Sequence, residues 1–360
     1  MWPYWLLFLI PAFQAVTKLR PAVQSPLGRD HLPFAWWSVF VSLVLMIGLR
    51  HEVGGDWANY LKNLDEVKDF TLEEALAAGG DPLYRLLNWL AADLELGIYI
   101  LNSVYAVLFS WGALIFCRNQ PRPWLALTVA VPYLITVVAM GYSRQGVAIG
   151  LAMLGFVALN NKSTIKFLLW IALAAMFHKS VIILVPAAAL VGTRRWVINL
   201  FIVGMTFGLL FVLLLQEAID TLKSGYILAE YESSGAAIRI AMNALPAALF
   251  LLFRRRFHLT PVQRTFWTWG AWSALAFVVL LYVSPSSTAV DRVALYWIPL
   301  QLFVWSRIPD AMGRPGSTNA GWVFAVVSYS AAVHFVWLFF ATHASLWLPY
   351  KFYPWVWLWQ

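Results

Sequence analysis

The chain has 360 residues, of which 61% are hydrophobic and only 12% are charged. A soluble globular domain has about half apolar and about a quarter charged residues, so this composition excludes that class. The single cysteine, Cys117, excludes an internal disulfide and a metal cluster held by thiolates. A net charge of +8 would suit nucleic-acid binding, but the basic residues are distributed in a way that argues against it.

About twelve apolar runs follow one another along the chain, separated by charged or Pro/Gly-rich breaks. Each run has to cover about 30 Å of hydrocarbon, and unpaired backbone groups are too costly in lipid, so we expect helices. The expected spans are 2–17, 33–49, 98–117, 124–140, 145–160, 165–177, 180–193, 196–215, 238–253, 266–283, 293–306 and 320–341. The predicted fold is an all-α polytopic membrane protein of about twelve transmembrane helices, with a single integral membrane domain over residues 1–360.

Basic and acidic residues fall on alternate breaks. If the first break, residues 18–32, faces the cytoplasm, the inner breaks hold 15 of the 25 Lys and Arg residues. Of the 17 acidic residues, those breaks hold only Asp30 and Asp310. This is the bias that the positive-inside rule describes, and it predicts that both termini lie outside. The inner basic residues are then expected to meet anionic membrane lipid rather than nucleic acid.

The first long outer segment, residues 50–97, is expected to form short amphipathic helices on the outer face of the membrane. Thr71 and Glu74 have the spacing of a capping box, and Asp81-Pro82 is read as a plain start of the next helix. Apolar residues at helical spacing are Trp57, Tyr60, Leu61 and Leu64 in one helix and Leu83, Leu86, Leu87 and Leu90 in another.

Residues 165–177 and 180–193 could form one tilted helix, but every later break would then change sides and reverse the charge bias. We therefore predict a hairpin of two short helices. Arms of this length reach only about 20 Å, so the apex at His178-Lys179-Ser180 is expected to stop short of the outer surface. Polar backbone at that depth is tolerated where it lines a wet cavity. His178 is thus expected to face a recessed cavity that opens outward.

Two later segments are also expected on the outer side. Residues 216–238 hold Tyr226, Glu230, Tyr231 and Glu232, and the tail from 347 to 360 is dense in Trp and Tyr. Lys223 and Arg239 are expected to be solvated or interfacial. On the inner side, Arg254-Arg255-Arg256 is read as an anchor that fixes topology and meets lipid.

Five charged or titratable residues are expected at the rim of the outer cavity: Arg50, Asp56, Arg144, His178 and Arg292. Guanidinium groups bind phosphate oxygens through two parallel charged hydrogen bonds and never deprotonate. They would stabilise the charge that builds on a diphosphate leaving group. His178, with an intrinsic pKa of about 6.5, could accept the proton of an attacking sugar hydroxyl.

These residues lie in motifs that resemble those of the EpsG family, which are Wzy-type bacterial exopolysaccharide polymerases. The matching motifs are Gly48-Leu49-Arg50, Gly54-Gly55-Asp56 with Tyr60, Asp81-Pro82-Leu83-Tyr84, Ser143-Arg144-Gln145, Phe177-His178-Lys179-Ser180 and Asp291-Arg292 with Tyr296. They match in order over roughly residues 45–300. The chain departs in two places: it has Gly-Gly-Asp-Trp where the family commonly shows Gly-Thr-Asp-Tyr, and Asp-Pro where Glu-Pro is usual.

The resemblance implies a multi-span glycosyltransferase of GT-C-like architecture in the bacterial plasma membrane. It implies polymerisation of undecaprenyl-diphosphate-linked oligosaccharide repeats on the outer face, without a nucleotide sugar, metal or other cofactor. In this scheme Arg50, Arg144 and Arg292 hold the diphosphate and His178 or Asp56 is the base. The matching tyrosines Tyr60, Tyr84 and Tyr296 are candidate sugar contacts. A chain-length regulator and export machinery are expected as further partners.

A structural role competes with the functional one at each position. Asp56 could cap a helix, Arg144 could anchor a helix at the lipid surface, and Arg292 could pair with Asp291. His178 could be a satisfied packing residue, although an ionisable group within the membrane is a functional candidate by default.

Two other functions remain open on the sequence. One is a lipid-linked-sugar glycosyltransferase that adds a single sugar, with Asp56 as base. The other is a lipid-oligosaccharide flippase or transporter, which would show broken helices and polar groups at mid-membrane in both halves.

Overall fold

The structure is a computed structural model that describes all residues except 22–32, 191–195, 216–234 and 359–360. Across the described residues the regular structure is helical, and the single β pairing is an isolated bridge between Arg50 and Phe352. The expected all-α class is confirmed. The expected features of residues 216–234, including Lys223, Tyr226, Glu230, Tyr231 and Glu232, lie outside the described part of the chain.

Each of the twelve expected runs coincides with helical structure. In the first half the elements are α1 (Trp2–Thr17), α2 (Phe34–Gly48), α3 (Trp57–Glu66), α4 (Leu72–Ala77), α5 (Pro82–Asp93), α6 (Gly97–Arg118), α7 (Pro123–Ala130), the π-helix η1 (Val131–Ala139), α8 (Ser143–Asn160) and α9 (Thr164–Ala175). In the second half they are the 3₁₀-helix η2 (Lys179–Leu190), α10 (Trp196–Leu210), the π-helix η3 (Phe211–Leu215), α12 (Ala236–Phe253), η5 (Arg254–Arg256), α13 (Pro261–Val283), α14 (Ser287–Ala294), η6 (Leu295–Trp297), α15 (Ile298–Trp305), α16 (Ile308–Met312), α17 (Ala320–Phe340), η7 (Ala344–Leu346) and α18 (Tyr353–Leu358).

Within the described residues, five helices are long and apolar enough to cross a membrane on length and composition. They are Gly97–Arg118, Val197–Leu214, Ala236–Arg256, Pro261–Val283 and Ala320–Phe340. Many large apolar side chains on these helices are exposed, for example Phe201 and Leu252, as lipid-facing residues are. Four shorter apolar helices, among them α2, α9 and η2, lie beside them. The chain is a helical membrane protein.

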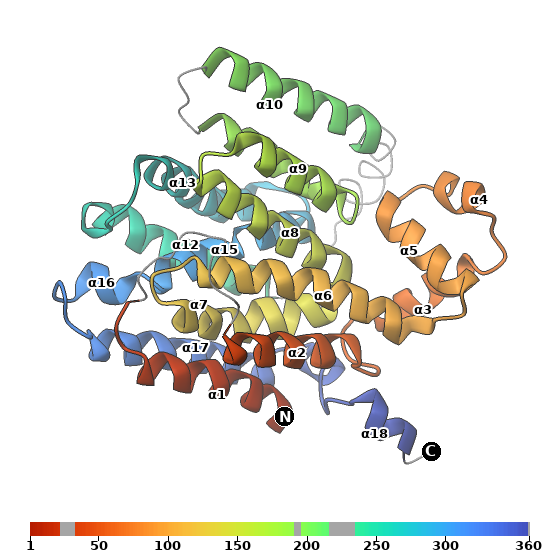
Figure 1. Ribbon diagram of the computed structural model, residues 1–360, viewed down its shortest axis with the longest axis horizontal. Coiled ribbons are helices and arrows are strands. Elements are labelled where there is room, and N and C mark those ends of the chain that lie inside the picture. Colours follow the sequence, from red (N-terminus) through yellow and green to blue (C-terminus); the bar gives the residue numbers. More distant parts are fainter. Residues whose placement is uncertain (22–32, 191–195, 216–234, 359–360) are drawn as a thin grey trace.

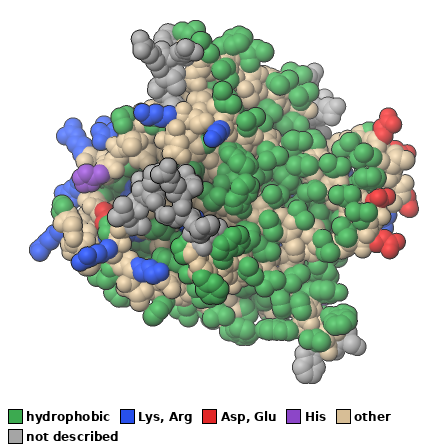
Figure 2. All heavy atoms as spheres, viewed as in Figure 1, with side chains coloured by type: hydrophobic (Ala, Val, Ile, Leu, Met, Phe, Trp, Pro, Cys, Tyr) green, Lys and Arg blue, Asp and Glu red, His purple; other side chains and the backbone are tan. Residues whose placement is uncertain are grey.

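The helices run roughly parallel, from α10 at one edge of the molecule to α1 and α17 at the other (Figure 1). Figure 2 shows Lys and Arg gathered at the end formed by α16 and the α12–α13 connection, with Asp and Glu at the opposite end over α3–α5. Apolar side chains occupy the band between them. We call these ends the basic end and the acidic end. The predicted separation of charge between alternate breaks is therefore present in three dimensions.

Contacts between distant breaks confirm which of them share an end. At the basic end, Arg122 forms an ion pair with Asp310, with an Nη2–Oδ1 distance of 2.7 Å. Pro121, Arg256 and Arg307 line one cavity there. Pro121 and Arg256 can lie at the same end only if the chain between them crosses the bundle an even number of times. The number is even when residues 165–193 cross the bundle twice, as the hairpin prediction requires.

The hairpin differs from the prediction in its second arm. α9 and η2 pack against one another, and η2 also packs against α10. η2 is a 3₁₀-helix that contains Pro186, not an α-helix. Because proline removes a backbone donor and clashes with the preceding turn, it disfavours α-helix at that point.

The centre of the bundle is α8, which is buried along almost its whole length. It packs closely on α6, where a Cβ on Gly112 would lie only 1.9 Å from the Gly150 carbonyl oxygen. Small residues allow such close backbone approach between membrane helices. A side chain at the first turn of α8, such as Arg144, therefore extends from a buried and closely packed helix.

The α3–α5 layer at the acidic end agrees with the prediction in part. The Thr71–Glu74 capping box is present, so α4 begins as expected. The buried face of α5 is not the leucine face, because Tyr84, Asn88 and Ala91 are buried whereas Leu90 is exposed. Asn88 donates from Nδ2 to the Tyr105 hydroxyl at 3.2 Å, so polar and aromatic contacts with α6 decide which face turns inward.

Leu61 in α3 is likewise exposed, although Trp57, Tyr60 and Leu64 of the same helix are buried. Three of the four residues predicted on the packed face of α3 are thus correct. Leu61 lies on the rim of that face, where helical spacing alone does not decide burial.

Candidate functional site

Five segments far apart in sequence meet at the acidic end. They are the turn after α2, the start of α5, the start of α8, the turn between α9 and η2, and the α14–η6 junction. These segments carry every charged residue that the sequence places at the site. The contacts between them define which side chains can act together.

Asp81 links three of these segments. Its Oδ2 accepts from Arg144 Nη1 at 3.3 Å, and its Oδ1 accepts from the Lys179 backbone amide at 3.0 Å. Asp81 occupies the N-cap position of α5 but forms no capping hydrogen bond with its side chain. The interpretation of Asp81-Pro82 as a plain helix start is therefore wrong for the side chain. The carboxylate instead joins α8 to the turn that carries His178.

Arg144 faces both this carboxylate and the solvent. Its side chain remains 39% exposed, whereas Asp81 is only 5% exposed. The guanidinium carbon lies 4.9 Å from the centroid of the Tyr84 ring, which supports it from α5. One edge of the guanidinium is thus held in place while the rest can reach a ligand. A simple lipid-anchoring role would not require this support.

His178 sits in a polar setting rather than among apolar side chains. Its Nδ1 lies 2.9 Å from the Ser180 hydroxyl oxygen, which lies 3.0 Å from the Tyr296 hydroxyl. The imidazole is half-buried, so part of it remains accessible. Burial, followed by the positive charges of Arg144, Arg292 and Lys179, lowers the pKa of His178 to about 3. The ring is therefore neutral at physiological pH, and this low pKa makes it a weak base in the free protein.

Arg292 is held by a ring and not by a neighbouring acid. Its guanidinium carbon lies 4.3 Å from the centroid of Tyr142, and its backbone carbonyl accepts from Gln145 Nε2. No carboxylate of the described residues lies within ion-pair distance of it. The alternative pairing of Arg292 with Asp291 is absent from the ion pairs of the described residues, which leaves the Arg292 charge available to a ligand.

Asp291 instead pairs with Arg239. Two hydrogen bonds, of 2.8 and 2.7 Å, join the guanidinium to both carboxylate oxygens. The expectation that Arg239 is solvated or interfacial is wrong, since its side chain is only 14% exposed. Adjacent residues of a helix point in different directions, so Asp291 turns toward α12 while Arg292 turns toward α8.

Asp56 lies at the N-cap position of α3, but its side chain forms no capping hydrogen bond. The carboxylate is half-buried, and it interacts electrostatically with Tyr60, Tyr142 and Arg144. No ion pair joins it to another described residue. Asp56 is therefore a cap by position only, and its carboxylate is near Arg144 and available.

Arg50 lies behind this surface. It is 1% exposed and donates from Nε to the Val53 carbonyl at 3.2 Å, from Nη1 to the Ile47 carbonyl, and from Nη2 to the Ser143 hydroxyl at 2.7 Å. The bonds to Ile47 and Val53 hold the turn after α2 in shape, and the bond to Ser143 ties that turn to the start of α8. The geometry thus favours a positioning role for Arg50, although its predicted contact with diphosphate stays a prediction.

The three candidate sugar-contacting tyrosines are also buried. Tyr60, Tyr84 and Tyr296 are each at most 4% exposed. Tyr84 supports Arg144, and Tyr296 bonds to Ser180. In this structure they orient the residues that face outward, and a direct contact with sugar would require the surrounding side chains to move.

Sequence reasoning missed the role of the C-terminal tail, which was read only as an aromatic segment. Residues 344–353, which we call the C-terminal strap, bind the turn that carries Arg50 and Asp56. The strap carbonyls of Leu346 and Lys351 accept from Gly54 and His51, each at 2.9 Å. Trp347 is buried, and its indole donates to the Thr136 carbonyl at 2.8 Å. No local pattern in the tail reveals these partners, of which Thr136 lies 211 residues earlier and His51 and Gly54 about 300 residues earlier.

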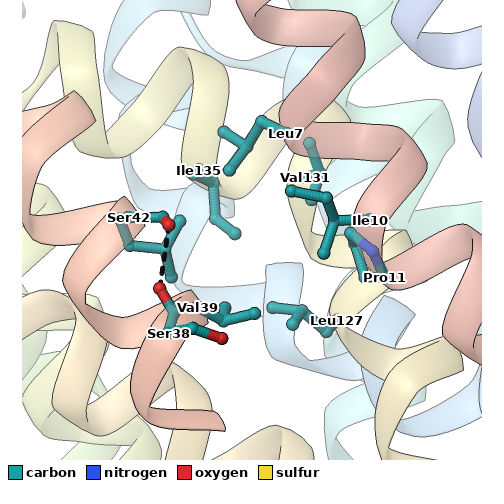
Figure 3. A pocket seen from close by; sticks show the side chains of 10 residues that line it. Leu7, Ile10, Pro11, Ser38, Val39, Ser42, Leu127, Val131 and Ile135 are labelled. Atoms are coloured by element: carbon teal, nitrogen blue, oxygen red, sulfur yellow. Dashed lines mark hydrogen bonds between the residues drawn. The ribbon is translucent and has the colours of Figure 1, made fainter. Parts of the chain in front are cut away.

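A separate hollow opens between α1, α2 and the α7–η1 segment. Its volume is about 160 Å³, and Figure 3 shows Leu7, Val39, Leu127 and Ile135 around it. The polar side chains among its lining residues are Ser38 and Ser42, and none is charged. This hollow suits a hydrocarbon chain and not the charged part of a ligand. The polar cluster around Arg144 and His178 is therefore the candidate functional site.

A protein-family model described as the EpsG family matches residues 34–352. The chain belongs to the EpsG family. No curated protein and no solved structure matches it. Membership indicates a membrane protein of polysaccharide biosynthesis. The match extends beyond the region of the resembling motifs to Phe352, so the EpsG match includes most of the C-terminal strap.

The glycine motif of this EpsG protein gives a first prediction. Gly54 has φ +104°, and a Cβ there would lie 2.5 Å from the Met140 carbonyl oxygen. Gly54→Ala is therefore expected to lower the free energy of unfolding by about 2 kcal/mol, measured by thermal denaturation in detergent. Gly55→Thr is the matched control, because a Cβ at Gly55 meets nothing closer than 3.6 Å and threonine restores the usual family pattern. Equal stability of the two variants would contradict this account.

Asp81 gives a second prediction. Asp81→Asn keeps an acceptor for the Lys179 amide but removes the charge that holds Arg144, so we expect polysaccharide production to fall about tenfold. Asp81→Glu restores a carboxylate, which is the usual family residue, and should regain most of the activity. The measurement is the rate of polysaccharide production by each variant. Full activity of the asparagine variant would show that the Asp81–Arg144 pair has no part in positioning.

Proposed function

We propose that the chain polymerises undecaprenyl-diphosphate-linked oligosaccharide repeats into an exopolysaccharide or capsule. The observation that supports this most is the juxtaposition of two accessible guanidinium groups, Arg144 and Arg292, with a neutral and half-exposed His178. Cations beside a proton acceptor suit a transfer reaction in which a diphosphate leaves and a hydroxyl attacks. Membership of the EpsG family supports the same substrate class.

The proposed step is a direct displacement. A hydroxyl of one lipid-linked repeat attacks the anomeric carbon of the sugar that links the growing glycan to a second undecaprenyl diphosphate. The new glycosidic bond forms as the bond from that carbon to the diphosphate oxygen breaks, and the electron pair leaves on the diphosphate. His178 takes the hydroxyl proton, with Asp56 as the alternative base. The products are a glycan longer by one repeat and free undecaprenyl diphosphate, and the anomeric configuration is inverted.

The proposed roles are of two kinds: some residues would contact the substrate, and others would hold those residues in position. Arg144 and Arg292 would bind the diphosphate, and their own supports, Asp81 with Tyr84 and Tyr142 with Gln145, would fix their positions. Arg50 would act from behind by holding the α2 turn against α8. Ser180 and Tyr296 would orient the imidazole. Bound diphosphate would offset the nearby positive charge and raise the pKa of His178 toward that of a better base.

We further propose the cellular setting. All twelve apolar runs would cross the bacterial plasma membrane in a GT-C-like arrangement, with both termini and the acidic end on the outer face. The ring contact between Trp2 and Trp355, with centroids 6.2 Å apart, supports the placement of both termini on one side. Partners in this setting would be the lipid-linked oligosaccharide, membrane lipid, a chain-length regulator and export machinery.

The test uses purified full-length protein in lipid nanodiscs, supplied with one lipid-linked repeat and analysed on a gel. A ladder spaced by whole repeats is expected. NMR of the product linkage should show inversion relative to the donor. A product extended by one sugar would indicate the single-sugar transferase instead. Movement of intact lipid-linked repeat across the bilayer without any new linkage would indicate a flippase. Retention of configuration would overturn the direct displacement.

A further inference from the structure

The basic end contains a polar cavity that the proposed reaction does not use. It lies between the α6–α7 connection, the α12–α13 connection and α16, and its volume is about 210 Å³. That is more than ten times the ~15 Å³ that one water needs, so a small ligand group fits. The polar residues that line it are Arg256, His258, Thr260, Gln263, Arg307 and Asp310. Figure 2 shows this end of the molecule rich in Lys and Arg.

Arg307 is the central feature of this cavity. The residue is only 7% exposed, yet it lines the cavity wall. Its Nη1 donates to the Gln120 side-chain carbonyl and to the Phe303 carbonyl, the latter at 3.1 Å. Its Nε and Nη2 have no hydrogen-bond partner among the described residues. Neither nitrogen is among the fully buried side-chain donors without a partner, so both are reached from the cavity, where an anion can complete their bonds.

The acid in the cavity wall is already bound by another arginine. Asp310 accepts from Arg122 Nε at 2.9 Å and from Arg122 Nη2 at 2.7 Å, so both carboxylate oxygens are engaged. Arg307 therefore has no carboxylate of its own among the described residues. Arg256 is exposed at the same cavity and adds a second positive charge. The charge left facing the cavity is positive.

The α13 helix adds to this field. It begins at Pro261 behind the Thr260–Gln263 capping box, and both capping residues line the cavity. The first turn of a helix has a partial positive charge that favours anions. α13 is 23 residues long, so this contribution is fully developed. The cavity thus combines two arginines, a histidine and a helix start.

We propose that this cavity binds a phosphate group, with Arg307 as its inner ligand and Arg256 and His258 at its rim. A phosphate offers oxygens to both free nitrogens of Arg307 at once, which matches the planar fork of the guanidinium. The group could belong to the headgroup of an anionic phospholipid or to a soluble phosphate. The site lies at the opposite end of the bundle from Arg144 and His178, so it is separate from the proposed catalytic cluster.

The test uses the full-length protein and two probes. Retention of phosphatidylglycerol is measured by native mass spectrometry after exchange into a zwitterionic detergent. Binding of inorganic phosphate is measured by ³¹P NMR line broadening. Arg307→Met keeps an apolar stem of similar length, and we expect it to weaken binding at least tenfold. Arg256→Glu alters an exposed residue, so it tests the rim even if the Arg307 variant does not fold.

The matched control is Arg264→Glu, an exposed basic residue on α13 that does not line the cavity. It should bind both probes like the wild type. Loss of lipid retention alone in Arg256→Glu would identify a headgroup site, and loss of phosphate broadening alone would identify a soluble ligand. Equal binding by wild type, Arg256→Glu and Arg264→Glu would overturn the proposal. None of these outcomes depends on polymerase activity.

Discussion

Replacement of His178 with alanine is expected to reduce the rate of polymer formation by about 10²- to 10⁴-fold, as the loss of a general base does. The imidazole is half-buried and oriented by Ser180, and burial, followed by the charges of Arg144, Arg292 and Lys179, lowers its pKa so that it is neutral. The measurement is the initial rate of ladder formation in nanodiscs. His343→Ala is the matched control, because that histidine is exposed and makes no contact with the cluster. An active His178 variant would leave Asp56 as the base, which Asp56→Asn would then test.

The pH profile offers a second check on His178, because its acid limb should respond to the removal of a nearby cation only if His178 is the base. The pKa of His178 is lowered to about 3, so in the free enzyme the base stays neutral as pH falls through 6.5. The value of kcat/KM reports groups of the free enzyme, and it should show no loss from His178 between pH 8 and about 5. Arg144→Ala removes one of the cations that depress this pKa, so the acid limb of the profile should move upward.

Replacement of Arg144 with alanine is expected to reduce the rate at least ~100-fold, the range seen when one donor to a developing anion is lost. Arg144 is an accessible cation that is held by Asp81 on one edge and by the Tyr84 ring. Arg144→Lys keeps the charge but loses the fork, so an intermediate rate is expected. Arg264→Ala, at the basic end, should leave the rate unchanged.

A double variant separates chemistry from folding at Arg144. Arg144→Ala alone leaves the buried Asp81 carboxylate without its ion-pair partner, which itself destabilises the protein. Arg144→Ala with Asp81→Asn removes that unpaired charge and should regain thermal stability. If Arg144 binds the diphosphate, the double variant stays inactive despite this recovery. Recovery of activity together with stability would show that Arg144 acts only as a partner of Asp81.

The hairpin and its histidine could be predicted because membrane topology depends on summed charge, which needs no knowledge of contacts. If residues 165–193 formed one span, Arg254, Arg255 and Arg256 would lie on the outer side, against the charge bias. The structure instead agrees with a hairpin that crosses the bundle twice. The helical form of the second arm could not be predicted in this way. Hydropathy is the same for an α-helix and a 3₁₀-helix, so the distinction depends on Pro186 and local packing.

The partners of the charged residues show the limit of local reasoning. Adjacency in sequence made a pair between Asp291 and Arg292 one of two open alternatives, yet Asp291 binds Arg239, which is 52 residues away. Asp81 looked like a helix cap, yet its oxygens bind residues 63 and 98 positions later. Sequence spacing shows which charged side chains occur near the end of a helix. It does not show which distant helix packs beside them and supplies their partners.

The all-helical membrane class, the alternation of basic and acidic breaks and the residue types of the candidate site follow from the amino-acid sequence alone, because hydropathy and charge act along the chain. The packing of the helices decided which arginine is buried as a support and which ones remain accessible. It also decided that the C-terminal strap holds the Gly54 turn and that Arg307 faces a cavity. The reason is that burial and pairing depend on which helices pack together, and that arrangement is set by contacts between segments hundreds of residues apart.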